Sequence, residues 1–522
     1  MPPPSTTSQE PAISSETQKF RSQMGQISRH SAVFFTGTVF TAAAGYLFKV
    51  YLARTLGAEA LGIYALGMTI VGFLGLFSGL GLPQAAVRFV ALYTATGRSA
   101  QLRAFIIRCV GLLMPANALI ATLLLFAGPW VADHFYRTPA LSQYFRLFAL
   151  IMVLGALTTF FGQVLQGYKD VSRRTVITNF IGTPLMMLLT VGLVFLGNGL
   201  WGYLVAQVLS AAAVLILLIV TAWKLSPAAA RSLRGPVLPL ESQVFAFGLT
   251  VFGSGMLEFF LAQADKILIG FFINAREVGI YAVAMAIVAF IPIALQSVNQ
   301  IFSPTIADLH GRGERELLGR LFQTLTKWIL GLTLPLATVT IVFAKPLMRI
   351  FGPDFEAGWI VLVIGTLGQL VNCGTGSVGY LLLMSGNQNR LIKVQAAMTG
   401  ITLLLNAALI PRYGITGAAF ASAFTNVVSN VWYLRELRES LAMSPYNRSY
   451  LRLLAPAAVV IAAALVLRST MAWVRPQWTV AVLSGIVGYA LLLAVATVMG
   501  LNDDDRIVTR AVLARFRRQV PH

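Results

Sequence analysis

The segment Ala58-Glu-Ala-Leu-Gly-Ile-Tyr-Ala-Leu-Gly-Met-Thr-Ile-Val71 occurs a second time in this chain, as Ala275-Arg-Glu-Val-Gly-Ile-Tyr-Ala-Val-Ala-Met-Ala-Ile-Val288. Eight of the 14 positions are identical at an offset of 217 residues, and the same offset carries Lys49 onto Lys266. Each lysine interrupts a long apolar run, and a lysine near the middle of a bilayer costs about 2.5–3.5 kcal/mol. Two such costs at matched positions predict one site at the interface of two pseudo-symmetric halves.

The composition is that of a membrane protein. Of the 522 residues, 57% are hydrophobic and only 11% are charged, whereas a soluble domain carries about 25% charged residues. A helix that crosses a hydrocarbon core of about 30 Å needs about 20 mostly apolar residues. We therefore predict an all-α polytopic protein with about 14 transmembrane helices. The candidate spans are 31–53, 60–86, 104–127, 144–166, 175–196, 200–223, 244–272, 279–303, 321–344, 358–384, 391–411, 415–434, 451–468 and 478–500.

The net charge of +20 follows the predicted membrane topology. With the N-terminus placed in the cytoplasm, Lys and Arg in cytoplasmic tails and loops outnumber those in external loops by about three to one, which is the positive-inside rule. This bias explains the basic charge without a nucleic-acid partner. It also predicts that both termini are cytoplasmic.

The repeat unit is about six spans long, which predicts two six-helix lobes. Because six is even, equivalent helices enter the membrane in the same direction, so the lobes are parallel repeats related by an axis along the membrane normal. The last two spans lie outside the repeat. The predicted divisions are a disordered cytoplasmic tail (1–30), an N-lobe (31–224), a cytoplasmic linker (225–242), a C-lobe (243–440), the last two spans (445–500) and a basic amphipathic cytoplasmic tail (501–522).

Three ionisable residues fall within the predicted span 244–272. Glu258 and Asp265 are seven residues apart and so share nearly one helix face, while Lys266 lies about 100° round from Asp265. Such groups within a span usually mark an ion or substrate path. An alternative is that Asp265 pairs with Lys49 and acts as a gate latch. We predict that Glu258 and Asp265 serve in ion coupling or gating.

Other polar residues in the predicted spans are candidates for substrate binding. Arg88 follows the glycine- and proline-rich end of the second span and would face the cytoplasmic mouth, although an anchor at the membrane surface is an equally good interpretation. Side-chain amides suit sugar hydroxyls, although hydrogen bonds between helices are their commoner use in membranes. The amide candidates are Gln163, Gln296, Asn299 and Gln300.

Sequence motifs for catalysis are lacking. There is no Walker loop, no nucleophile elbow and no metalloprotease histidine pair. The two cysteines, Cys109 and Cys373, lie in apolar segments without metal-ligand spacing. We expect a protein that is not an enzyme and that needs no metal or cofactor, with coupling to an H⁺ or Na⁺ gradient left open.

A family resemblance rests on several short motifs in a fixed order. The first half reads Lys49-Val-Tyr-Leu-Ala-Arg-Thr-Leu-Gly57, then Leu61-Gly-Ile-Tyr-Ala65, then Gly79-Leu-Gly-Leu-Pro-Gln-Ala-Ala-Val-Arg88. The second half repeats the theme as Asp265-Lys-Ile-Leu-Ile-Gly270 and Val278-Gly-Ile-Tyr-Ala282. Over roughly residues 28–500 the chain resembles the Wzx-like polysaccharide flippases of the multidrug/oligosaccharidyl-lipid/polysaccharide (MOP) exporter superfamily.

This resemblance implies two lobes around a central cleft that opens alternately to the two sides of a bacterial cytoplasmic membrane. It implies translocation of an oligosaccharide unit linked to a polyprenyl diphosphate, with membrane lipids and other polysaccharide assembly proteins as partners. Such family members tend to have a cationic cavity, which suits an anionic diphosphate. Lys49 and Lys266 fit that role because an ammonium group bonds phosphate strongly.

Three alternatives remain open at this point. A lipid II flippase of the same superfamily would share the fold and the chemistry. A cation-coupled multidrug exporter would use carboxylates such as Glu258 and Asp265. A glycan polymerase or ligase belongs to a different class, and the short external loops, of which 128–143 is the longest, argue against it.

Overall fold

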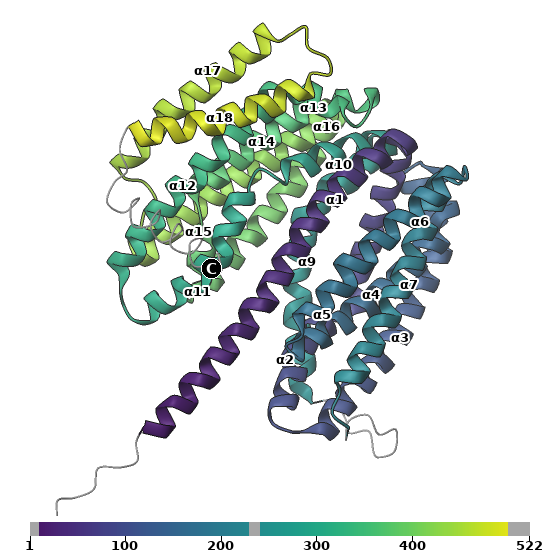
Figure 1. Ribbon diagram of the computed structural model, residues 1–522. Helices are drawn as coiled ribbons and strands as arrows, with labels where there is room; N and C mark the ends of the chain where they lie inside the picture. The colour runs from purple at the N-terminus through teal and green to yellow at the C-terminus, as the bar shows by residue number, and fades with distance from the viewer. Residues whose placement is uncertain (1–9, 229–240, 499–522) are drawn as a thin grey trace, which may run out of the picture. The chain divides into compact units, whose positions relative to one another are not determined.

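The computed structural model describes residues 10–228 and 241–498 (Figure 1). These residues form helices joined by turns and short irregular segments, with no β-strand among them. The predicted all-α fold class is therefore confirmed. Ten helices in this part of the chain are long and apolar enough to cross a membrane, or eleven if α10 (Ala275–Val288) and the start of α11 (Ile293–Gly311), bent by 54°, form one span.

The chain divides into two compact units. The first comprises Met1–Thr55, Ile70–Asp133 and Pro139–Met256, and the second comprises Leu56–Thr69, His134–Thr138 and Leu257–His522. Three helices contribute residues to both units: α1 (Glu10–Gly79), α9 (Ser242–Phe272) and the short π-helix η1 (Val131–Phe135). The other helices of the first unit are α2 (Leu82–Ala95), α3 (Ser99–Trp130), η2 (Pro139–Tyr144), α4 (Phe145–Gly167), α5 (Val171–Thr175), η3 (Val176–Gly182), α6 (Thr183–Phe195) and α7 (Gly199–Leu225). The second unit continues after α11 with α12 (Arg315–Val342), α13 (Ala344–Arg349), η4 (Pro353–Gly358), α14 (Trp359–Thr375), α15 (Val378–Met384), α16 (Gln388–Leu441), η5 (Arg448–Leu453), α17 (Leu454–Thr470) and α18 (Trp478–Val498).

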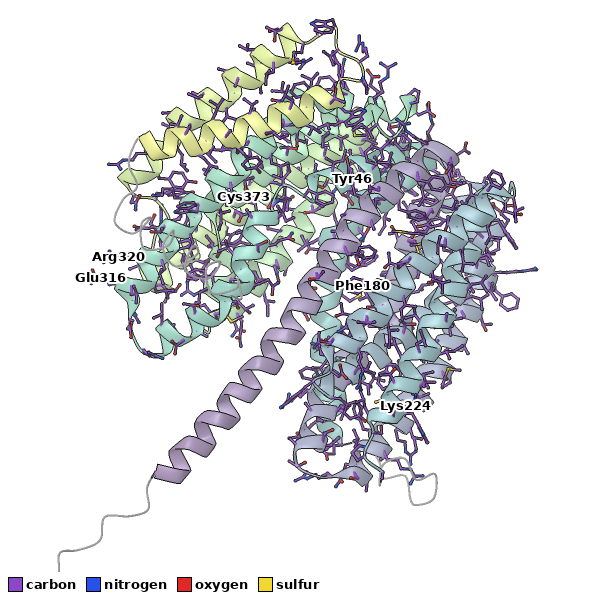
Figure 2. The ribbon with its side chains drawn as sticks, viewed as in Figure 1. Tyr46, Phe180, Lys224, Glu316, Arg320 and Cys373 are labelled. Carbon is purple, nitrogen blue, oxygen red and sulfur yellow. The ribbon has the colours of Figure 1, made fainter. Side chains whose placement is uncertain are left out.

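Apolar side chains form both the core and the exterior of the first unit. Helix α4 packs against α2, α3 and α7, and Phe89 and Phe160 are fully buried in this core. Phe180 of the π-helix η3, labelled in Figure 2, stacks on Phe40 of α1 with the ring centroids 5.4 Å apart. By contrast, Phe126 and Phe195 are 82% and 90% exposed. Helices that are apolar all round are typical of a bundle surrounded by lipid.

In the second unit, α18 and the short helix η5 each donate a hydrogen bond at an irregular point of a neighbouring helix. Helices α17 and α18 pack on each other and on α12. Pro335 interrupts the hydrogen-bond ladder of α12 because proline has no N–H, and the Tyr489 hydroxyl of α18 donates to the carbonyl of Leu332 in the same turn at 3.0 Å. Likewise the Tyr450 hydroxyl of η5 donates to the carbonyl of Gly374, at the end of α14, at 2.8 Å.

All fourteen predicted spans fall mainly on helical residues, but two pairs of them are joined end to end. Helix α1 has a kink at Gly57 (φ 80°) and contains the span 31–53 and most of 60–86. Helix α16 has a kink at Gly414 (φ 61°) and contains the spans 391–411 and 415–434. Positive φ at these kinks is a conformation that glycine adopts without strain. The number of membrane crossings stays a prediction.

One predicted segment differs in the structure, and two others lie wholly or mostly outside the described residues. Helix α1 begins at Glu10, so residues 10–30 are helical where the sequence favours a disordered tail. Pro11 lies in the first turn of this helix, where proline is tolerated. The basic tail 501–522 and most of the linker 225–242 lie outside the described residues.

The internal repeat produces a reciprocal backbone contact within the second unit. A Cβ atom placed on Gly62 would lie 1.6 Å from the carbonyl oxygen of Ala275, and one placed on Gly279 would lie 2.0 Å from that of Ala58. Gly62 and Gly279 are equivalent in the repeat, as are Ala58 and Ala275. A contact in which each segment meets its own equivalent in the same way is what a two-fold relation produces. The repeat read from the sequence is therefore present in the packing of these two helices.

Candidate functional site

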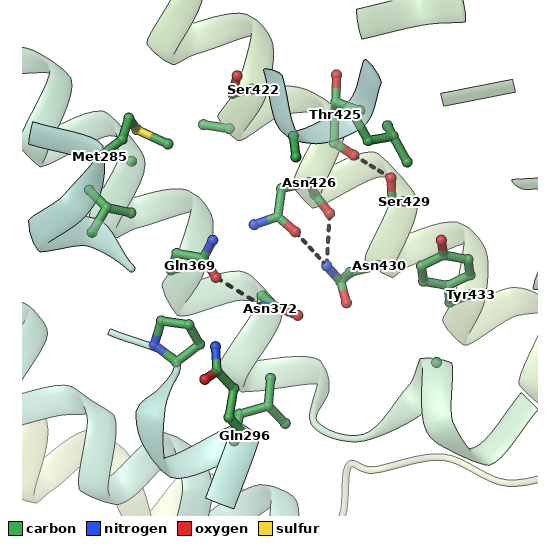
Figure 3. Close-up of a pocket in the computed structure, with 18 of the residues that line it drawn as sticks. Met285, Gln296, Gln369, Asn372, Ser422, Thr425, Asn426, Ser429, Asn430 and Tyr433 are labelled. Carbon is green, nitrogen blue, oxygen red and sulfur yellow. Dashed lines mark hydrogen bonds between the residues drawn. The ribbon is translucent and has the colours of Figure 1, made fainter. Parts of the chain in front are cut away.

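The second unit contains a cavity of about 590 Å³ (Figure 3). Helices α9, α10, α11, α14, α15 and α16 all contribute to its wall. The cavity reaches the surface at Gln296 and Tyr380, whose side chains are exposed. Its polar lining residues are Asp265, Gln296, Asn299, Gln369, Asn372, Ser377, Tyr380, Thr402, Ser422, Thr425, Asn426, Ser429, Asn430 and Tyr433.

A network of amides holds one wall of this cavity in a fixed arrangement. Asn430 Nδ2 donates to Asn426 Oδ1 at 2.9 Å, and Asn372 Nδ2 donates to Gln369 Oε1 at 3.0 Å, as the dashed lines in Figure 3 show. The Thr375 hydroxyl donates to Asn430 Oδ1 at 3.0 Å and so joins α14 to α16. Polar networks that are satisfied in this way rigidify the helices that carry them.

Small residues allow the two helices of this wall to approach closely. A Cβ atom on Gly368 of α14 would lie 3.0 Å from the Cα atom of Ala423 on α16. Small residues at such contacts are typical of helix pairs in membranes. The close approach places the amides of α14 and α16 within hydrogen-bonding reach of one another.

Two further polar atoms at the wall have no hydrogen-bond partner. They are Asn299 Oδ1 and Ser377 Oγ, in side chains that are 7% and 2% exposed. Buried polar atoms in proteins almost always have a partner, so each exception needs an explanation. Ser377 follows the break between α14 and α15, where Gly376 has a φ of 69°. Both residues line the cavity, but these two atoms are covered by neighbouring atoms and are not reached from it.

Asp265 is the one carboxylate that lines the cavity among the described residues. It is 8% exposed. Its Oδ2 accepts a hydrogen bond of 2.5 Å from the Tyr281 hydroxyl, and its Oδ1 accepts one of 2.8 Å from the backbone N–H of Lys266. The Tyr281 hydroxyl also lies 3.5 Å from Ser422 Oγ. Asp265 is therefore held by neighbouring groups and directed toward a polar space.

The other ionisable residues predicted for the site do not line this cavity. Lys266 is half-buried, and its Nζ donates to Gln263 Oε1 at 2.8 Å. Lys49, in the first unit, is exposed, and so is Glu258. A shared site of Lys49 and Lys266, and a pairing of Asp265 with Lys49, stay predictions.

The amide candidates and Arg88 have different surroundings. Gln296 and Asn299 line the cavity, whereas Gln300 is exposed and does not. In the first unit, Gln163 is half-buried, and its Oε1 atom is buried without a partner. Arg88 is exposed, with its guanidinium carbon 5.6 Å from the ring of Phe89 and 5.3 Å from that of Phe247. The structure thus brings together Asp265, Gln296 and Asn299 of the predicted set.

The sequence reasoning missed the amides of α14 and α16. Ser422, Asn426 and Asn430 follow one another at intervals of four within a predicted span, and this spacing places them on one helix face. That stripe was the available signal. Gln369 and Asn372 are also three residues apart and share a face of α14.

A multi-pass helical protein with a polar cavity inside one helical unit is, by its fold, a membrane protein, and the comparisons with known proteins identify its family. Residues 51–356 match the model of the family described as polysaccharide biosynthesis protein, and the chain belongs to that family. A relative in Haloferax volcanii, named a probable low-salt glycan biosynthesis flippase (Agl15), is 22% identical over 79% of this chain and 83% of its own.

Solved structures with a similar fold are also transporters. The lipid II flippase MurJ in an inward closed conformation matches with a TM-score of 0.69 and 14% identity, over 89% of this chain and 98% of that one. An inward-facing multidrug transporter of the MATE family, a member of the MOP superfamily, matches with a TM-score of 0.63 and 14% identity, over 77% and 94%. The predicted family resemblance and the predicted two-lobe fold are confirmed.

Proposed function

We propose that this protein is a flippase that moves a lipid-linked oligosaccharide unit across the membrane by alternating access. The observation that carries the proposal is the cavity in the second unit, which lies among membrane helices and whose polar lining residues, apart from Asp265, are neutral amides, hydroxyls and phenols. Sugar hydroxyls both donate and accept hydrogen bonds, and such groups complement them. The naming of a relative as a glycan biosynthesis flippase supports the same function.

The proposed substrate has two chemically different parts, and the chain offers a different group to each. The polyprenyl diphosphate is anionic, and Lys49 and Lys266 are suited to bind it, because charge-assisted hydrogen bonds to phosphate are strong. Arg88 and Gln163 are further candidates in the first unit. The saccharide is rich in hydroxyls and suits Gln296 and Asn299. No covalent bond is made or broken, so the protein acts as a transporter and not as an enzyme.

Coupling to an ion gradient is part of the proposal. Asp265 lies at the cavity wall and Glu258 lies two turns earlier on the same helix. An ionisable group within a membrane span commonly serves in a proton or cation path. A change of charge at Asp265 would alter its bond with Tyr281, because a protonated oxygen donates where a carboxylate oxygen accepts. The proposal places the chain in a bacterial cytoplasmic membrane with both termini cytoplasmic, among membrane lipids and other polysaccharide assembly proteins.

The test is head-group translocation in proteoliposomes. The purified protein is reconstituted with a fluorescent polyprenyl-diphosphate disaccharide, and translocation is measured with and without a proton or sodium gradient. Protein-dependent translocation that responds to a gradient is expected. Translocation of lipid II alone would favour the lipid II flippase, and efflux of a cationic dye without lipid translocation would favour the drug exporter.

A further inference from the structure

The cavity in the second unit has no positive charge among its described lining residues. Asp265 is its one charged side chain, and the remaining polar groups are neutral amides, hydroxyls and phenols. An anionic ligand group in this cavity would meet a carboxylate and no cation. Transferring a charged group into such a site is costly unless an opposite charge compensates it.

The nearest lysine along the chain lies beside Asp265 but outside the lining of the cavity. Lys266 follows Asp265 directly, so its side chain leaves α9 about 100° round the helix. Its Nζ donates to Gln263 Oε1 at 2.8 Å, and neither Lys266 nor Gln263 lines the cavity. The ammonium group of Lys266 and the cavity therefore lie on different faces of α9.

The polar groups of the lining favour a ligand that can both donate and accept hydrogen bonds. The amides of Gln296, at the exposed rim, and of Gln369, Asn372 and Asn426 carry both donors and acceptors. A sugar hydroxyl can donate to their oxygens and accept from their N–H groups. A carboxylate oxygen on a sugar can only accept, so it cannot donate to these oxygens as the hydroxyl that it replaces can. Tyr380 and Tyr433, also in the lining, offer apolar ring faces to the C–H groups of a sugar ring.

We propose that this cavity is the saccharide subsite of the transporter and that it selects neutral, hydroxyl-rich sugars over sugars that carry a carboxylate. The inference rests on the proposed function and deepens it, since it names the class of saccharide and the residues that select it. The negative charge of the lipid diphosphate is bound outside this cavity. Selectivity arises from the absence of a cation in the lining and from the hydrogen-bond donor that a sugar loses when a hydroxyl is replaced by a carboxylate.

A matched pair of probes tests the proposal. Both are short-chain polyprenyl diphosphates bearing a disaccharide, with a terminal glucose in one and a terminal glucuronate in the other, so they differ in oxidation at one carbon. Binding to the purified protein is measured by isothermal titration calorimetry, and translocation is measured separately in proteoliposomes. The glucose probe is expected to bind at least tenfold more tightly.

Charge substitutions on α11 locate the selectivity. Gln296→Lys adds a cation at an exposed position of the cavity rim and is expected to reduce the glucose preference to threefold or less. Ser297→Lys adds the same charge on the same helix at an exposed residue outside the lining, and it is expected to keep the preference.

The outcomes separate the subsite from the transport function. Equal binding of the two probes, tighter binding of glucuronate, or no binding of either would overturn the selective subsite, even if both probes are translocated. An equal effect of Gln296→Lys and Ser297→Lys would also overturn it. Selective binding without translocation of either probe would retain the subsite and remove the flippase function.

Discussion

Positions 48 and 265 are equivalent in the internal repeat, and the two units of the molecule use them in opposite ways. Phe48 is 9% exposed, and its ring packs near those of Tyr51 and Tyr203, with centroids 5.9 and 6.2 Å away. Asp265 is 8% exposed, accepts a hydrogen bond from Tyr281 and lines a cavity. Equal burial therefore serves aromatic packing in one unit and a polar site in the other. The duplicated helix keeps its place while its chemistry has diverged.

The repeat has stayed alike where backbone meets backbone. At Gly62 and Gly279 no side chain fits, because a Cβ atom would lie within 2.0 Å of a carbonyl oxygen of the equivalent segment. Side chains as different as Phe48 and Asp265 occupy the equivalent positions 48 and 265. At position 279, by contrast, the backbone contact admits only glycine. Substitutions at the backbone contact of Gly62 and Gly279 are therefore expected to reduce folding stability strongly. Substitutions at position 265 are expected to change transport.

The largest effect is expected from Gly279→Ala. The added methyl group must separate two helices in backbone contact, which should cost about 3 kcal/mol or more of folding free energy. The measurement is thermal unfolding of the purified protein followed by size-exclusion chromatography. Gly253→Ala is the matched control, because a Cβ atom there meets nothing within 4 Å. If Gly279→Ala were as stable as that control, the reciprocal contact would be refuted.

A strong loss of transport is expected from Lys266→Ala and from Lys49→Ala. Losing an ammonium partner of a desolvated phosphate should cost about 2–5 kcal/mol, or at least about 30-fold in translocation. Both variants should reach the membrane in wild-type amounts, since Lys49 is exposed and Lys266 is half-buried. Lys393→Ala, at an exposed residue of α16, serves as the control. Full translocation by the double variant would exclude the lysines from substrate binding, and an effect of only one would show that the repeat is not symmetric in function.

The sequence predicts the repeat and the helices better than it predicts which side chains face the cavity. The repeated segment and the offset between Lys49 and Lys266 were sufficient to predict the repeat, and the long apolar runs were sufficient to predict the helical fold. That the span holding Asp265 is important for function stays a prediction. The sequence was insufficient to show which of Asp265 and Lys266 faces a cavity. Adjacent residues on a helix are about 100° apart, so together they indicate only a wide sector of the helix surface. Packing separates them, by directing Asp265 toward Tyr281 and Lys266 toward Gln263.

The cavity itself was beyond the sequence for a related reason. Asn372 and Asn430 are far apart in the chain, and each alone resembles an ordinary amide that joins two membrane helices. Only the packing of α14 against α16 brings both of them to the wall of the cavity. Ser377 depends in addition on the break after α14. When several helices form one site, each helix contributes only part of the polar lining, and this partial pattern is hard to recognise in its sequence.

A smaller and more selective effect is expected from Asp265→Asn. The amide removes the charge yet keeps an oxygen that can accept from Tyr281, so the hydrogen bond and the fold should persist. Translocation should lose its response to a proton or sodium gradient while gradient-independent translocation falls about threefold or less, which corresponds to under about 1 kcal/mol. Asp133→Asn, at an exposed residue of the first unit, is the control. An unchanged gradient response in Asp265→Asn, with a loss in Glu258→Gln, would move the coupling role to Glu258.

The smallest effect on translocation is expected where the second unit has an addition that lies outside the repeat. Helix α18 rests on the Pro335 turn of α12, since a Cβ atom on Gly488 would lie 3.4 Å from Pro335 Cβ, and the Tyr489 hydroxyl donates to the carbonyl of Leu332 in that turn. Tyr489→Phe removes this one hydrogen bond and should cost about 1 kcal/mol of stability, with translocation unchanged. Hydrogen exchange of α12 and thermal unfolding measure the loss, with Tyr413→Phe, at a residue 64% exposed, as the control. Wild-type stability in Tyr489→Phe would show that α18 holds the turn by packing alone. Loss of translocation at unchanged stability would instead make the added helices part of the transport cycle, and the two units would then differ in mechanics as well as in the chemistry of positions 48 and 265.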